Sequence, residues 1–205
     1  AMLYAAGVFL KQLSIVTAGL FAFVGVFIYL NPNRIARLTS FWVDDFWASN
    51  DAKVHQTQQA LIGIARGDWF GTGIGAGIQK YSLLPERHTD MIFAVIGEEL
   101  GILGMMFVLL SFLFILLKGF KIAKVALQKG RYYSSYVVFG ICTWFAMQIT
   151  VNIGMNLGLL PPKGFTLPLL SYGGTSMIFA IISLAIILRV DMENRTKYSK
   201  QRHYV

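Results

Sequence analysis

The chain has 205 residues, a formal net charge of +8 and a mean hydropathy of +0.59, with 56% hydrophobic but only 14% charged residues. Soluble domains carry about 25% charged residues, so this composition excludes an ordinary cytosolic domain, and its hydrophobicity excludes a disordered chain. An excess of basic over acidic residues, together with a high apolar content, is typical of a membrane protein whose Lys and Arg residues lie on one side of the membrane. The single cysteine, Cys142, excludes an intramolecular disulfide and a Cys-based zinc site.

Four apolar stretches are long enough to span a bilayer, which takes about 20 residues. A shorter apolar piece, 1–10, is the expected end of an earlier span, and no signal peptide is recognised. The sequence therefore predicts an all-α, polytopic helical membrane protein: a single membrane domain with four transmembrane helices plus the end of another. The predicted helices are residues 13–30, 91–117, 132–158 and 169–188.

The charges between these spans predict how the chain lies in the membrane. Segment 118–131 carries five basic residues and no acidic one, and 189–205 is also basic on balance. The positive-inside rule places both segments in the cytoplasm and the large loop 31–90, which is neutral overall, outside. A nucleic-acid binder would instead gather its basic residues in a patch on a polar fold, so nucleic acid is not expected as a partner.

The large outer loop contains two features with a local pattern. Residues Val54–Arg66 are predicted to form a short amphipathic helix that ends at Gly67. The run GTGIGAG at 71–77 follows, without the Gly-Lys-Ser/Thr of a phosphate-binding loop. We therefore interpret this run as a flexible or tightly packed re-entrant turn.

Acidic residues mark the passage from the outer loop into the second span. A spacing of four places Asp90, Ala94 and Glu98 on one helical face. Ionisable groups at membrane depth usually face the bundle interior or a wet cavity. Asp90 has a second interpretation as the cap of the helix start, which leaves Glu98, roughly two turns deeper, unexplained.

Two further features point to the same outer side. Gln148, Asn152 and Asn156 form an amide stripe in the third span, which predicts interhelical hydrogen bonds or a second wall of the same cavity. The short outer loop 159–170 carries one charge, Lys163. Its ammonium suits an anionic group such as a lipid phosphate, and snorkelling to the interface is the alternative.

Two long motifs identify a family. LPERHTDMIFAVIGEELGILG and NIGMNLGLLPPKGFTLPLLSYGGTS resemble, in order and spacing, the SEDS family of bacterial shape, elongation, division and sporulation proteins. The segment Lys163–Pro168 is similar to the cell-division (FtsW-like) branch more than to the elongation branch. The resemblance extends over essentially the whole chain and implies that it corresponds to the C-terminal part of a longer family member.

The resemblance implies a peptidoglycan glycosyltransferase that polymerises lipid II, the undecaprenyl-pyrophosphate disaccharide pentapeptide, into glycan strands during cell division. The implied location is the outer face of the bacterial cytoplasmic (inner) membrane at the division septum. Implied partners are a class B penicillin-binding protein, other division proteins and membrane lipid. A lipid II flippase and a scaffold for the division machinery remain the alternative functions.

The resemblance also assigns roles to residues. The family's essential aspartate corresponds to Asp90, which is expected to act as general base for the attacking sugar hydroxyl. The leaving pyrophosphate must be stabilised by positive charge. This charge is expected from basic side chains or from a divalent cation held by Asp90, although no dedicated metal site is predicted. The expected substrate-binding residues are Lys163, Arg87, His88, Lys80, Glu98 and Ser171, with Arg34 and Arg37 as further candidate cations.

Overall fold

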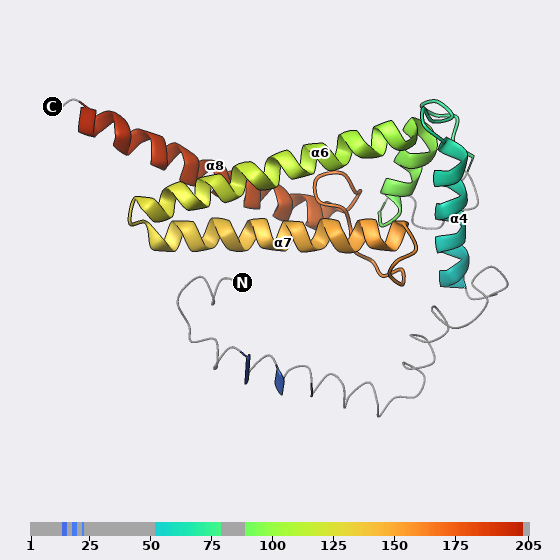
Figure 1. Cartoon of the computed structure of the whole chain (residues 1–205), viewed down its shortest axis with the longest axis horizontal. Helices are drawn as coiled ribbons and strands as arrows, with labels where there is room; N and C mark the ends of the chain where they lie inside the picture. The colour runs from blue at the N-terminus through green and yellow to red at the C-terminus, as the bar shows by residue number, and fades with distance from the viewer. Residues whose placement is uncertain (1–13, 16–17, 20–21, 23–51, 79–88, 203–205) are drawn as a thin grey trace.

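The computed structural model describes residues 14–15, 18–19, 22, 52–78 and 89–202 of the chain. Every regular element in this part is helical, which confirms the all-α prediction. The predicted span 13–30 lies largely outside the described residues, and those described within it are helical. The four helices are α4 (Ala52–Gly67), α6 (Ile92–Gln128), α7 (Tyr132–Asn156) and α8 (Gly174–Arg202) (Figure 1).

The long helices form a small bundle with α4 at one end. α6 and α7 lie side by side, α8 crosses them, and α4 stands beside the start of α6 (Figure 1). Three helical stretches, Ile92–Gln128, Tyr132–Asn156 and Gly174–Thr196, are long and apolar enough to cross a membrane. The chain is therefore an integral membrane protein in which α4 packs against the bundle of long helices.

A seven-residue repeat brings α6 and α7 together. Buried residues of α7 recur at alternating steps of three and four, the pattern of coiled-coil pairing, and those of α6 recur every seven residues from Met105 to Ala126. The helices approach closely at Gly119, where a Cβ atom would lie 2.3 Å from Sγ of Cys142. The buried, free thiol of Cys142 therefore fills the space left by the absent side chain of Gly119.

The outer surface of α6 is covered by large apolar side chains. Phe107, Leu110, Phe114 and Leu117 are each more than half exposed. Apolar patches of this extent mark surfaces covered by a membrane or by other protein segments. This surface agrees with the apolar composition from which the membrane class was predicted.

Several helix ends differ from the ends of the predicted spans. α6 continues to Gln128, so Lys118, Lys121 and Lys124 lie on the helix, because Lys is a good helix former and the chain turns only at Lys129 and Gly130 (φ +71°). α8 begins at Gly174 rather than at 169 and extends to Arg202. Leu169, with φ +66°, lies in the loop before it, because a left-handed residue cannot continue a right-handed helix.

Candidate active site

Asp90 lies in the turn immediately before α6. The helix begins at Ile92, and its N-cap is Met91, so Asp90 does not occupy the cap position that was its alternative interpretation. Met91 and Ala94 are buried against Ala60 of α4, whereas Asp90 is only half-buried. The turn is thus anchored by its apolar neighbours and leaves Asp90 at the edge of the packed region.

Two asparagines of α7 hold the backbone at Asp90 and at Ala94, in the first turn of α6. Nδ2 of Asn152 and Nδ2 of Asn156 donate to the Asp90 carbonyl oxygen at 2.9 and 3.0 Å. Oδ1 of Asn156 accepts a hydrogen bond from the backbone N–H of Ala94 at 3.0 Å. Both asparagines are fully buried, where hydrogen bonds of this kind are costly to break. The interhelical bonding predicted for the amide stripe is confirmed, and it does not involve the Asp90 carboxylate.

The loop between α7 and α8 brings Lys163 to the same place. A Cβ atom on Gly164 would lie 3.6 Å from Oδ2 of Asp90, so the carboxylate lies against this loop. Nδ2 of Asn152 also donates to the backbone oxygen of Phe165 at 2.5 Å, which ties the loop to the asparagines that hold Asp90. The side chain of Lys163 is exposed. The carboxylate of Asp90 and the loop that carries Lys163 therefore lie next to each other.

Hydrogen bonds from polar side chains, of which that of Ser171 is buried, hold the second half of this loop. Oγ of Ser171 accepts the backbone N–H of Leu167 at 2.6 Å, and the N–H of Ser171 donates to the Leu167 oxygen at 3.0 Å. Nε2 of Gln148 donates to the Thr166 oxygen at 2.8 Å, and the Thr166 hydroxyl lies 2.7 Å from that of Ser176. Ser171 is only 2% exposed, so its hydroxyl serves the loop from inside.

A cavity of about 430 Å³ opens behind the loop, between α7 and α8. Its wall combines the aromatic side chains of Trp144, Phe145 and Phe179 with the polar side chains of Gln148 and Ser176. The cavity therefore suits an apolar chain with a polar end, because ligand pockets are mostly apolar with a few placed polar groups.

Glu98 is buried against the glycine-rich loop. Its Oε1 accepts the backbone N–H of Ile78 at 2.8 Å, and a Cβ atom on Gly77 would lie 2.9 Å from its Oε2. The predicted acidic stripe with Asp90 is not formed as a helical face, because Asp90 precedes the first residue of α6. Glu98 therefore anchors the glycine-rich loop through Ile78 and Gly77.

The sequence analysis missed a break in α6 at Gly101, which has φ +67° and ψ −165°. The break leaves carbonyl groups without their usual helical partners, a costly situation for a membrane helix. The oxygens of Glu98 and Glu99 are satisfied from outside the helix, by the backbone N–H groups of Thr72 at 2.9 Å and Gly73 at 3.1 Å.

The same outer segment, residues 67–78, here called the clasp, also serves the far side of the break. The backbone N–H of Ile102 donates to the oxygen of Asp68 at 2.9 Å, and that of Leu103 donates to the oxygen of Trp69 at 3.3 Å. Backbone groups on both sides of the break are thus paired by one loop.

Glycines allow the clasp to approach the helix this closely. A Cβ atom on Gly71 would lie 2.1 Å from the oxygen of Glu99, and one on Gly67 would lie 1.9 Å from the oxygen of Gly97. Of the two interpretations of the 71–77 run, the tightly packed turn is confirmed. The sequence feature that corresponds to this packing is a pair of glycine-rich segments, one before α6 and one within it. The sequence alone does not predict that the two segments are in contact.

The other expected substrate contacts, Lys80, Arg87 and His88, and the candidate cations Arg34 and Arg37, lie outside the described residues. Within the residues described, no group of three or more His, Cys, Asp or Glu side chains is placed to hold a metal ion.

Sequence relatives and a solved structure match nearly the whole chain. The chain is 46% identical over 200 residues to "Probable peptidoglycan glycosyltransferase FtsW" of Legionella pneumophila, covering 95% of this chain and 49% of that protein. It is 42% identical over 194 residues to the protein of the same name from Francisella salina, with 95% and 48% covered. The chain thus spans about half the length of the curated relatives it matches.

The fold matches that of a chain in a solved structure described as "Structural coordination of polymerization and crosslinking by a peptidoglycan synthase complex". The TM-score is 0.70 at 26% identity, over 95% of this chain and 52% of that one. Residues 1–196 match the cell cycle protein family of FtsW, RodA and SpoVE. The chain therefore belongs to this family, as its two long motifs predicted.

Proposed function

We propose that the protein polymerises lipid II into peptidoglycan glycan strands during cell division, with this chain supplying the catalytic base. The observation that carries the proposal is the half-buried Asp90, held through its backbone by Asn152 and Asn156 while its carboxylate lies against Gly164. The names of the relatives, peptidoglycan glycosyltransferase FtsW, support the reaction class.

The reaction follows from the chemistry of the substrate. A sugar hydroxyl of one chain attacks the anomeric carbon of the other, and the bond from that carbon to the pyrophosphate oxygen breaks. The α-linked donor gives a β-linked product, so one displacement with inversion suffices. The Asp90 carboxylate takes the hydroxyl proton, and the polyprenyl pyrophosphate leaves with the electron pair. A positioned base suits this step because proton transfer in the transition state is typically worth about 10²–10⁴-fold in rate.

Positive charge at the leaving group is assigned first to Lys163. Its loop is held by hydrogen bonds at Thr166 and Leu167, and Gly164 of the same loop lies next to Asp90. The exposed ammonium of Lys163 can there contact a phosphate of lipid II in the bound substrate and in the transition state alike. Arg87, His88 and Lys80 are proposed as further substrate contacts, and a divalent cation held by Asp90 is the alternative source of charge.

Glu98 and Ser171 are proposed to support substrate binding through the loops that they hold. Glu98 fixes the clasp through Ile78, and Ser171 closes the turn that follows the Lys163 segment. The cavity behind that turn is the proposed place for part of the polyprenyl chain, since its wall is largely aromatic and apolar.

The proposed setting is the bacterial inner membrane at the division septum, with Asp90 outside and the C-terminus in the cytoplasm. The basic segment 118–131, at the opposite end of α6 from Asp90, supports this orientation. A class B penicillin-binding protein and other division proteins are the proposed partners. The matched structure, whose description joins polymerisation with crosslinking, supports a partner synthase.

A polymerisation assay tests this function directly. The intact protein, purified with its proposed class B partner, is given lipid II in detergent, where no membrane barrier has to be crossed. We expect glycan strands, detected by gel electrophoresis of labelled product. Transfer of lipid II across vesicle membranes without any polymer would instead identify the flippase and contradict the proposal.

Lys163→Ala is expected to raise the KM for lipid II roughly fivefold with little change in kcat. The reason is that one partly solvated contact to phosphate is worth about 1 kcal/mol in substrate and transition state alike. Lys163→Arg keeps the charge and should retain a nearly normal KM. An unchanged KM in Lys163→Ala, measured by initial polymerisation rates, would remove this role from Lys163.

A further inference from the structure

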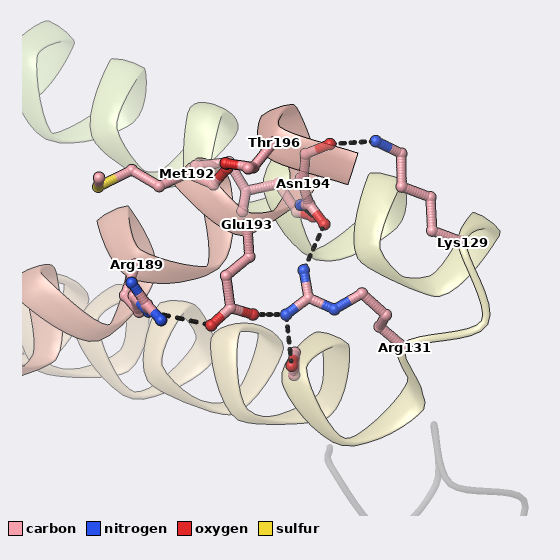
Figure 2. A network of polar contacts seen from close by, with 9 residues as sticks. Lys129, Arg131, Arg189, Met192, Glu193, Asn194 and Thr196 are labelled. Atoms are coloured by element: carbon pink, nitrogen blue, oxygen red, sulfur yellow. Dashed lines mark hydrogen bonds and ion pairs between the residues drawn. The ribbon is translucent and has the colours of Figure 1, made fainter. Parts of the chain in front are cut away.

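A network of charged residues joins the three long helices at the end of the bundle far from Asp90. Arg131, in the turn between α6 and α7, pairs with Glu193 of α8 and donates from Nη1 to Oδ1 of Asn194 at 3.2 Å (Figure 2). The ammonium of Lys129 donates to the backbone oxygen of Asn194. Nε of Arg189 donates to Oε1 of Glu193 at 3.0 Å. The α6–α7 turn is therefore fastened to α8 by side chains rather than by apolar packing alone.

A pocket of about 460 Å³ opens beside this network, lined by Arg131, Arg189, Met192, Glu193 and Thr196. Two guanidinium groups share one carboxylate there, so the lining keeps one unit of positive charge. Arg131 is largely buried, with a side chain only 18% exposed, whereas that of Arg189 is 71% exposed. Among the described residues, the terminal amino groups of Arg189 have no hydrogen-bond partner, so the pocket offers donors to an anion.

The surroundings of the pocket are those of a membrane surface. It lies at the end of the stretch Gly174–Thr196, which is apolar enough to cross a membrane. Leu188 and Met192 are exposed apolar side chains next to it along α8, and Tyr132 and Tyr133 are exposed at the start of α7. Tyrosines are enriched at the level of lipid headgroups. The segment 118–131, with five basic and no acidic residues, adds positive charge at the same end.

We propose that this pocket binds the headgroup of an anionic phospholipid. The phosphate contacts the free amino groups of Arg189 and lies near Arg131, and the adjoining apolar chain lies along Met192 and Leu188. Arginine suits this role because its planar fork of donors matches the oxygens of a phosphate. Basic pockets between transmembrane helices are known to take such headgroups. The bound lipid would brace the α6–α7 turn against α8.

A lipid explains the pocket better than a soluble anion does. Free phosphate would satisfy the arginines equally well, but it would leave the exposed Met192 and Leu188 without a function in the site. A zwitterionic lipid carries its own cation next to its phosphate, so it gains less from the net positive lining. The proposal therefore predicts selectivity for net-negative headgroups over both competitors.

The test uses the intact protein in nanodiscs of phosphatidylcholine containing a small fraction of phosphatidylglycerol. Native mass spectrometry of the released protein measures the lipid that remains bound. We expect retention of phosphatidylglycerol over phosphatidylcholine, and a roughly tenfold or greater loss of this retention in Arg189→Gln, the scale for losing a hydrogen-bonded charge pair. Arg195→Gln is the matched control, because Arg195 forms the same kind of pair with Asp191 one turn away but does not line the pocket.

A second variant separates binding from folding. Glu193→Gln removes the only negative charge of the pocket, so it should retain phosphatidylglycerol more strongly than the wild type. Equal losses in Arg189→Gln and Arg195→Gln would show general surface attraction and overturn the site. Displacement of the lipid by millimolar inorganic phosphate alone, with no preference for phosphatidylglycerol, would overturn the lipid assignment in favour of a soluble anion.

Discussion

Asp90→Asn is expected to reduce glycan polymerisation by the intact protein about 10²–10⁴-fold, the range for removing a general base. The fold should survive, because Asn152 and Asn156 bind the backbone oxygen of residue 90 and not its carboxylate. An asparagine has nearly the same shape as aspartate but cannot accept the proton of the attacking hydroxyl. The effect should therefore fall on kcat, measured as polymer formed from saturating lipid II.

Asp68→Asn is the matched control for this prediction. Asp68 is an exposed acidic residue of the clasp whose backbone oxygen, like that of Asp90, accepts an essential hydrogen bond, here from Ile102 at 2.9 Å. Its φ of +46° is well tolerated by asparagine. Polymerisation should be nearly normal in Asp68→Asn. Polymerisation at the wild-type rate in Asp90→Asn would rule out the base role.

Gly101→Ala is expected to destabilise the protein more than the same change at Gly104 or Gly119 of α6, where the added Cβ atom would meet only side chains. Its φ and ψ values are essentially confined to glycine, which costs an alanine about 1–3 kcal/mol. The new Cβ would also lie 2.5 Å from N of Gly71 and 2.6 Å from C of Trp69, both backbone atoms. Overpacking typically adds about 1–3 kcal/mol, so we expect a total loss of about 2–6 kcal/mol.

Gly130→Ala separates the two contributions. Gly130 has a similar φ of +71°, but a Cβ atom there meets nothing within 4 Å. It should therefore lose only the backbone part, about 1–2 kcal/mol. Thermal unfolding of the intact protein in detergent measures both variants. Equal midpoints for Gly101→Ala and Gly130→Ala would contradict the tight packing of the clasp on α6.

Local patterns were enough to predict several parts of this fold. The amphipathic stretch 54–66 with Gly67 after it corresponds to α4. The four-residue amide spacing predicted hydrogen bonding between helices, and the structure adds that Asn152 and Asn156 bond to the start of α6. Both features depend on the spacing of residues along a single helix, which can be recognised from the sequence alone. The proposed role of Asp90 rests on the family motif, since its spacing alone also fits a capping residue.

The remaining features depend on contacts between distant segments. The break at Gly101 exists because the clasp supplies hydrogen bonds to both of its sides, and no local pattern near Gly101 contains that information. The approach of Gly164 to Asp90 likewise requires α7 to return the chain to the start of α6. The helix continues beyond the predicted span 91–117 because loss of hydropathy marks where a helix leaves the apolar layer, while the helix itself ends where its backbone turns.

The contact between Gly119 and Cys142 makes the pairing of α6 with α7 chemically observable. The thiol is enclosed as long as the two helices stay together, and it is the only cysteine of the chain. Any rearrangement that separates these helices must uncover it, whether it accompanies substrate entry, partner docking or lipid loss. The rate at which a small alkylating reagent modifies Cys142 therefore measures how readily α6 and α7 separate, without an engineered label.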